Sequence, residues 1–210
     1  MPTPLLAFDR LSLRFDDRVL FTALSFATGA GCVALEADTG TGKSTLLRML
    51  AGDTDAGEGH VTVAGHSLTQ APDQARAALA YIPEDLPAYP VQTGRAFLEQ
   101  VAAARHTSLD DDVLTLADAF GLTPHLDKRF EQMSFGTRKK VLFSATMIGH
   151  VPVIIADEPT SGLDGPSRRA LAELFQTLAA DRVVFFTSYD ADFVRATDAR
   201  VVRFADLQSD

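Results

Sequence analysis

The residues best suited to chemistry in this sequence form a short glycine-flanked loop. Gly42-Lys43-Ser44 stands directly before an apolar run at 46–50, in a helix that Gly52 is expected to end. Glycines let backbone N–H groups converge on phosphate oxygens, and a helix N-terminus adds partial positive charge. The lysine would reach the terminal phosphates, and the serine hydroxyl is a ligand for Mg²⁺. The loop therefore predicts a site for a magnesium nucleoside triphosphate, formed by Thr39, Gly40, Thr41, Gly42, Lys43, Ser44 and Thr45.

The loop departs from the P-loop pattern at one position. The pattern has a glycine five residues before Gly42, where this sequence has Ala37. An alanine fits there if its φ angle stays negative, because the penalty for a methyl group is steep only in left-handed conformations. The alternative is a glycine-rich turn capped by Ser44 with no ligand, in which Lys43 would be incidental.

A pair of acids supplies the second half of the predicted chemistry. The apolar run at 153–156 ends in Asp157 and Glu158, and the C-terminal ends of parallel strands are where open α/β sheets bind ligands. Asp157 is expected to hold Mg²⁺ directly or through water, and Glu158 to polarise the water that attacks the γ-phosphate. In the alternative interpretation, the acids only cap the turn that follows them. We predict that this pair and the loop around Lys43 converge on one nucleotide.

Composition limits the class of protein. A chain of 210 residues with 46% hydrophobic content can bury one core without disulfides or metal. The single cysteine, Cys32, lies in an apolar run, which predicts a buried thiol in a reducing compartment and hence a cytosolic location. No apolar stretch approaches the ~20 residues that cross a bilayer, and a signal-peptide pattern is missing. The net charge of −9 argues against a nucleic-acid partner.

Alternating apolar residues predict an antiparallel β region at the N-terminus. The alternation covers residues 5–26 and returns at 60–65, which is interpreted as a strand or hairpin arm. His60 and His66 flank this arm. We interpret them as solvent-facing hairpin residues rather than metal ligands.

The apolar runs in the rest of the chain predict a parallel α/β sheet. Runs at 32–35, 153–156 and 183–186 are continuously apolar, as in strands that helices cover on both faces. A helical pattern at 167–180 separates two of them, and strand–helix–strand order is typical of parallel sheets. A further strand is expected at 201–204.

A helical insert is predicted over residues 98–120. The acidic run Asp110-Asp111-Asp112 is interpreted as a helix start, where negative charge is favourable, rather than as a metal site. The expected inner-face residues are Phe97, Val101, Val113, Leu114 and Leu116.

The order and spacing of these features resemble the ATP-binding cassettes of ABC transporters over nearly the whole chain. Residues 157–164 resemble the Walker B strand running into the D-loop, and residues 133–137 resemble the signature motif. The 81–99 region is similar to the ATPase subunits of multidrug or antibiotic exporters. The resemblance implies one ABC ATPase domain over residues 1–210, with a P-loop NTPase core of mostly parallel strands, an N-terminal antiparallel β subdomain and a helical subdomain at about 90–145.

The resemblance also implies a second cassette as partner. In this family two cassettes pack head to tail, so that the signature motif of one closes on ATP held by the P-loop of the other. A serine N-cap with only a structural role is compatible with this function, because capping and phosphate binding use the same helix end. Phe135 replaces the more usual glycine, and Thr137 the usual glutamine. On this basis we also expect nucleotide to be bound by Ser134, Phe135, Gly136, Thr137 and the D-loop residue Asp164.

Three further positions take expected roles from the resemblance. Phe15 falls where the family places an aromatic that stacks on adenine, with a core phenylalanine as the alternative. Glu84 stands where many members have the Q-loop glutamine, and its carboxylate would meet Mg²⁺ or the attacking water. Tyr189 stands where the family has a histidine that contacts the γ-phosphate. A tyrosine hydroxyl donates one hydrogen bond but carries no positive charge, so turnover is expected to be reduced.

The resemblance implies an ATPase that uses ATP and Mg²⁺, with Glu158, Lys43 and Tyr189 as its catalytic residues. It would power a separate membrane permease through ATP-driven dimerisation, at the cytoplasmic face of the membrane. Two other hypotheses stay open. One is a nucleotide-gated regulatory module with weak or no ATPase activity, which Ala37 and Tyr189 motivate, and the other is a soluble ABC ATPase without a transport role. Transported substrate, direction of transport and homo- or heterodimer formation are left open.

Overall fold

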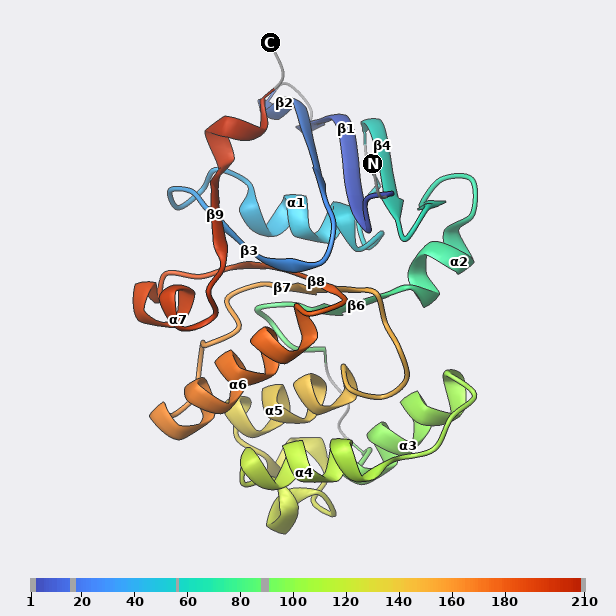
Figure 1. The fold of residues 1–210 in the computed structure, drawn as a ribbon, viewed down its shortest axis with the longest axis vertical. Helices are drawn as coiled ribbons and strands as arrows, with labels where there is room; N and C mark the ends of the chain where they lie inside the picture. The colour runs from blue at the N-terminus through green and yellow to red at the C-terminus, as the bar shows by residue number, and fades with distance from the viewer. Residues whose placement is uncertain (1–2, 16–17, 56, 88–90, 209–210) are drawn as a thin grey trace.

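The computed structural model describes residues 3–15, 18–55, 57–87 and 91–208; the side chains of Phe15 and Arg18 lie outside this description. The described elements form layers (Figure 1). An antiparallel sheet and helix α1 (Lys43–Leu50) lie on one side of a parallel sheet, and the helices within residues 94–145 and 165–178 lie on the other side. This is the α/β arrangement that the apolar runs predict.

The parallel sheet has five strands in the described residues. Their order is β6 (Leu79–Ile82), β7 (Val153–Ala156), β8 (Val183–Thr187), β3 (Gly31–Glu36) and β9 (Arg200–Arg203). All neighbours pair in parallel. Strands β7 and β8 are buried at every residue, because α1 and the antiparallel sheet cover one face and helices cover the other. Strand β9 lies at an edge, where Val201 is 51% exposed.

Alternate residues of the parallel strands enter two different hydrophobic cores. Ile155 and Phe185 pack in the core that includes α1 and the antiparallel sheet. Ile154 and Phe186 pack in the core formed with the helices on the opposite face. Because side chains alternate across a strand, one register serves both cores. Cys32 on β3 is buried, as predicted, and burial raises the pKa of its thiol to about 12.

The antiparallel sheet has the order β2 (Arg18–Thr28), β1 (Leu6–Phe15), β4 (Glu58–Val63) and β5 (His66–Ser67). The predicted N-terminal alternation is confirmed and falls into two long strands with irregular register. His60 and His66 are exposed on the hairpin of β4 and β5, as predicted. Among the described residues, no group of three His, Cys, Asp or Glu side chains could hold a metal ion.

The predicted helical insert consists of two helices. Helix α3 (Gly94–Ala104) ends at Arg105, and helix α4 (Asp111–Ala119) begins after Asp110. The Asp110 carboxylate accepts a hydrogen bond from the Val113 N–H group at 3.1 Å, so the acidic run starts a helix as predicted. The inner-face prediction is wrong for Leu114, which is 42% exposed. The buried stripe of α4 consists of Val113, Ala117 and Phe120, at helical spacing.

The described residues form four further helices and three 3₁₀ turns. They are α2 (Pro72–Ala77), α5 (Phe135–Ala145), α6 (Gly165–Leu178) and α7 (Ala191–Ala196), with short 3₁₀ turns η1 (Thr123–His125), η2 (Phe130–Gln132) and η3 (Phe204–Leu207). The short elements α2 and β6 were not predicted, because neither is long enough to show a clear periodicity. None of the helices in the described ranges has the length and apolar character needed to span a bilayer.

Phe175 on α6 provides a test of the core formed with the helices. It is fully buried, and its ring centre lies 5.4–5.9 Å from those of Phe143, Phe186 and Phe193. We predict that Phe175→Ala lowers the free energy of unfolding by about 3–5 kcal/mol, because it leaves a cavity. Equilibrium urea denaturation measures this loss. Leu114→Ala is the control and should change stability by no more than about 0.5 kcal/mol; similar losses for the two variants would contradict this packing.

Candidate nucleotide site

The glycine-flanked loop joins β3 to α1 in a conformation that leaves its backbone donors open. Gly40 and Gly42 have φ angles of 82° and 96°, which glycine adopts without steric penalty. Ala37 does not take a positive φ, as its tolerance in the loop requires. No side chain caps the first turn of α1 in the described residues, and a Cβ atom on Gly40 would meet nothing within 4 Å. Uncapped N–H groups at a helix start, beside a loop with room around Gly40, fit a phosphate chain.

Lys43 contacts Tyr189 across this loop. The Lys43 Nζ atom donates a hydrogen bond to the Ala37 carbonyl at 2.6 Å and lies 4.0 Å from the centre of the Tyr189 ring. The hydroxyls of Tyr189 and Thr39 share a hydrogen bond of 3.1 Å. This bond, and then the nearby Lys43 ammonium, lower the pKa of Tyr189. Tyr189 therefore lies against the predicted phosphate loop.

The two acids at the end of β7 are held to the end of β8 by one hydroxyl. Thr187 Oγ1 donates to Asp157 Oδ1 at 2.6 Å and accepts from the Glu158 N–H group at 3.0 Å. The Tyr189 N–H group donates to Glu158 Oε2 at 3.2 Å. Because Tyr189 also contacts Lys43, the acids and the phosphate loop meet at the C-terminal ends of the parallel strands, as predicted.

Glu158 has the properties of a residue that polarises water. Its φ angle is 42°, an uncommon left-handed conformation for a residue with a side chain. Its Oε1 atom is buried and has no hydrogen-bond partner among the described residues. Burial is the main cause that raises the pKa of Glu158, and the Tyr189 N–H group opposes it. A buried carboxylate with one uncommitted oxygen suits general-base chemistry.

The residues predicted to ligate Mg²⁺ come from three elements. Asp157 is buried after β7, Ser44 is exposed in the first turn of α1, and Glu84 is exposed two residues after β6. Strand β6 pairs with β7, with Ile82 opposite Ala156, so Glu84 follows a strand next to the one that carries the acids. Few carboxylates are enough for Mg²⁺, which usually takes one or two together with phosphate oxygens and waters. This donor set fits the ion.

The predicted signature residues lie at the start of α5, beside the loop that leads into α6. Ser134 is the N-cap of α5, and its Oγ atom accepts a hydrogen bond from the Thr137 N–H group at 3.1 Å. Gly136 lies so close to Gly162 that an added Cβ atom would be 2.2 Å from the Gly162 carbonyl oxygen. Only glycine fits this approach, which joins the signature residues to the predicted D-loop.

The signature residues face a cavity of about 510 Å³. Ser134, Gly136, Thr137, Lys140 and Asp164 contribute to its walls. In the described part of the chain, no residue of the glycine-flanked loop lines this cavity. Asp164 is also the N-cap of α6, and hydrogen bonds from Ser167, with Lys140 nearby, lower its pKa to about 2. One chain therefore carries two separate surfaces with the predicted nucleotide-binding residues.

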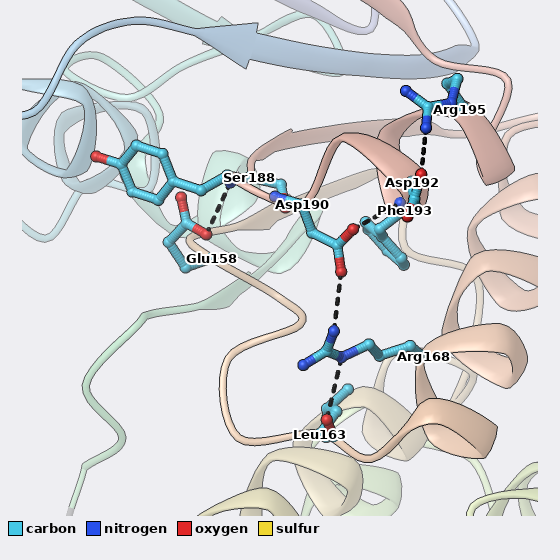
Figure 2. A network of polar contacts seen from close by, with 9 residues as sticks. Glu158, Leu163, Arg168, Ser188, Asp190, Asp192, Phe193 and Arg195 are labelled. Atoms are coloured by element: carbon cyan, nitrogen blue, oxygen red, sulfur yellow. Dashed lines mark hydrogen bonds and ion pairs between the residues drawn. The ribbon is translucent and has the colours of Figure 1, made fainter.

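Arg168 links the predicted D-loop to the segment after β8 (Figure 2). Its Nε atom donates to the Leu163 carbonyl at 3.1 Å, and its Nη1 atom donates to Asp190 Oδ2 at 3.1 Å. Asp190 also caps α7 by accepting from the Phe193 N–H group at 3.0 Å. Sequence reasoning missed Arg168, Asp190 and Thr187, because neither periodicity nor a motif marks them. Phe15 ends β1, and its predicted adenine contact lies outside the described side chains.

Comparison with known proteins identifies the family. The family model described as ABC transporter matches residues 23–161. This chain belongs to the ABC transporter family. Its fold is thus that of an ABC ATP-binding cassette, homologous to cassettes found in ABC exporters.

Several full-length relatives are much longer than this cassette. It is 30% identical over 174 residues to the human phospholipid-transporting ATPase ABCA7, covering 81% of this chain and 8% of that protein. It is 29% identical over 190 residues to the ABC transporter ATP-binding/permease protein Rv1747 of Mycobacterium tuberculosis, covering 87% of this chain and 22% of the relative. The cassette therefore spans a small part of these relatives.

Solved structures support the same fold. A structure titled as the ATP binding subunit of an ABC transporter is 26% identical, with a TM-score of 0.83 over 95% of this chain and 87% of that one. A bacterial Atm1-family ABC exporter with ATP bound is 22% identical, with a TM-score of 0.81 over all of this chain and 38% of that one. The second likeness bears on the fold alone.

Thr187→Val tests the link between the ends of β7 and β8. The substitution keeps the side-chain shape but leaves the buried Glu158 N–H group without its acceptor. We expect the free energy of unfolding to fall by about 1–3 kcal/mol in chemical denaturation. Thr177→Val, which changes an exposed threonine on α6, is the control and should change stability by about 0.5 kcal/mol or less. An unchanged stability for Thr187→Val would show that the hydroxyl does not hold the acids.

Proposed function

We propose that this cassette binds and hydrolyses Mg·ATP with the residues gathered at the C-terminal ends of the parallel strands. The observation that carries the proposal is the position of Tyr189, which contacts Lys43 on the phosphate loop and hydrogen-bonds to Glu158, two residues after β7. Tyr189 thereby brings together the phosphate loop and the acids after β7, which are far apart in the sequence. Thr39 to Thr45 would cradle the phosphates, and Ser44, Asp157 and Glu84 would hold Mg²⁺.

The catalytic roles follow from the geometry of three side chains. Lys43 would exchange its bond to the Ala37 carbonyl for one to the terminal phosphates, whose negative charge attracts it more strongly. Glu158 would orient the attacking water through Oε1, the oxygen without a partner in the described residues. When bound, Mg²⁺ would neutralise charge on the β- and γ-phosphates. Tyr189 would donate one neutral hydrogen bond, which gives slow turnover.

We propose that the second surface serves a second cassette. The cavity bordered by Ser134, Gly136 and Thr137 receives no residue from the phosphate loop in the described part of the chain, so a nucleotide there would come from a partner. Phe135 would lie at the same interface, and Asp164 of the D-loop would border it. ATP would then join two cassettes, because it binds the assembled pair better than either half.

We further propose that this single ATPase domain, with its helical subdomain at about 90–145, drives a membrane permease. The relatives named as transporters and as an ATP-binding/permease protein support this partner. The segment from Glu84 into α3 would form the contact surface, where Val91 is 76% exposed. The cassette would then lie at the cytoplasmic face of the membrane, with no role for nucleic acid.

Glu158→Gln tests the proposed hydrolysis. The amide keeps the shape of the carboxylate but cannot act as a base, so ATP turnover should fall by about 100-fold or more while ATP binding is retained. Phosphate release measures turnover, and light scattering should show ATP-dependent dimers of this variant. Glu173→Gln on the exposed face of α6 is the matched control and should match wild type. Wild-type turnover no higher than that of Glu158→Gln would refute the ATPase proposal.

Tyr189→His tests the cause of the proposed slow turnover. An imidazole at this position adds a group that carries positive charge near neutral pH, so kcat should rise by about tenfold. Tyr189→Phe, which keeps the ring over Lys43 and removes the hydroxyl, should not raise kcat. Steady-state ATPase assays compare the two. Equal rates for wild type and Tyr189→His would show that the tyrosine does not limit hydrolysis.

A further inference from the structure

Lys139 is a buried cation that the proposed function does not use. It lies on α5, five residues after the signature serine, and its side chain is completely buried. The Lys139 Nζ atom donates a hydrogen bond of 2.6 Å to the backbone carbonyl of Glu158 and lies 5.4 Å from the centre of the Phe135 ring. A signature-helix residue thus contacts the backbone of the proposed base.

Burying this ammonium is unfavourable unless nearby groups stabilise its charge. Burial is the main cause that lowers the pKa of Lys139, to about 8, and the acids around it oppose that shift. An unpaired buried charge costs several kcal/mol, so such groups persist where partners hold them. The acids that favour the charged form, in order of effect, are Glu84, Glu158, Asp157 and Asp85.

The backbone of Glu158 is held on both sides. Its N–H group donates to Thr187 Oγ1 at 3.0 Å. Its carbonyl accepts from Lys139 Nζ at 2.6 Å and from the Ser161 N–H group at 3.1 Å. A non-glycine residue with φ of 42° is strained and persists only where its surroundings over-determine it. Lys139 supplies one of these constraints, and the conformation it supports directs the carboxylate to the Tyr189 N–H group.

We propose that Lys139 is a positioning residue, which holds the left-handed backbone of Glu158 and thereby aims its carboxylate at the attacking water. This inference rests on the proposed function of Glu158. Lys139 acts through a backbone carbonyl and does not touch the nucleotide. The same helix begins with Ser134 and Phe135, so the position of the base is tied to the position of the signature residues.

Lys139→Met separates positioning from folding. Methionine has a similar length and no charge, and the Glu158 carbonyl keeps the Ser161 N–H group as a donor, so no buried acceptor is left alone. Lys139→Arg keeps a charged donor at the same place. We therefore expect both variants to fold, with Lys139→Arg closer to wild type in activity.

Steady-state ATPase kinetics test the role in hydrolysis. Lys139→Met should lower kcat by about 10- to 100-fold, because a base displaced by a fraction of an ångström orients the attacking water poorly. KM should stay within about twofold, and Lys139→Arg should restore most of kcat. In a Glu158→Gln background, Lys139→Met should change the residual rate by less than about twofold, because the group that it positions is already gone.

Hydrogen exchange tests the same contact without ATP turnover. In the free protein, Lys139→Met should speed exchange in peptides that span residues 157–164, and Lys139→Arg should not. Arg105→Met is the control. It removes a cation that caps the opposite end of α5 through the Ala145 and Ile148 carbonyls. It should lower stability but leave kcat and exchange at 157–164 unchanged.

The outcomes distinguish the two proposals. Unchanged exchange at 157–164 in Lys139→Met, or an equal fall in rate with and without the Glu158 carboxylate, would overturn the positioning role. Equally slow turnover in Arg105→Met would also overturn it, because a general loss of stability would then explain the effect. If wild type shows no ATPase above Glu158→Gln, the proposed hydrolysis fails, and the exchange data alone decide whether Lys139 holds Glu158.

Discussion

The hydroxyl of Thr187 joins the ends of two parallel strands, and the geometry of the site depends on this contact. It donates to Asp157 and accepts from the Glu158 N–H group, so both acids are fixed relative to β8. Two residues later, Tyr189 reaches back to the Glu158 carboxylate and forward to Lys43 and Thr39. A short buried hydrogen bond thus sets where a base, a cation and a phosphate loop meet.

The two hydrophobic cores fix the strands that carry the site residues. Strands β7 and β8 send alternate side chains to opposite faces, and a one-residue slip would reverse every one of them. Their register is therefore strongly specified by burial. With the strands fixed, the residues that follow their C-terminal ends, Asp157 and Tyr189 among them, are held in place. The strain at Glu158 is tolerated because its surroundings are held in this way.

The separation of the phosphate loop from the signature residues supports the proposal that ATP joins two cassettes. Gly136 packs against Gly162, which places Ser134 and Asp164 on a common surface. Lys139 runs from the same helix into the core and holds the Glu158 carbonyl. A change at the signature surface therefore has a short, packed route to the proposed base, made of one helical turn and one hydrogen bond.

The sequence by itself determined the family, the fold class and the convergence of Lys43 with Asp157 and Glu158, because these follow from local motifs and from strands with a clear apolar pattern. It also predicted the helix start at Asp110. Only the tertiary structure decided the contacts of Thr187 and Lys139 and the exposure of Leu114. These depend on contacts between residues distant in the chain and on which face of a helix meets its neighbour, and neither is encoded in the spacing of nearby residues.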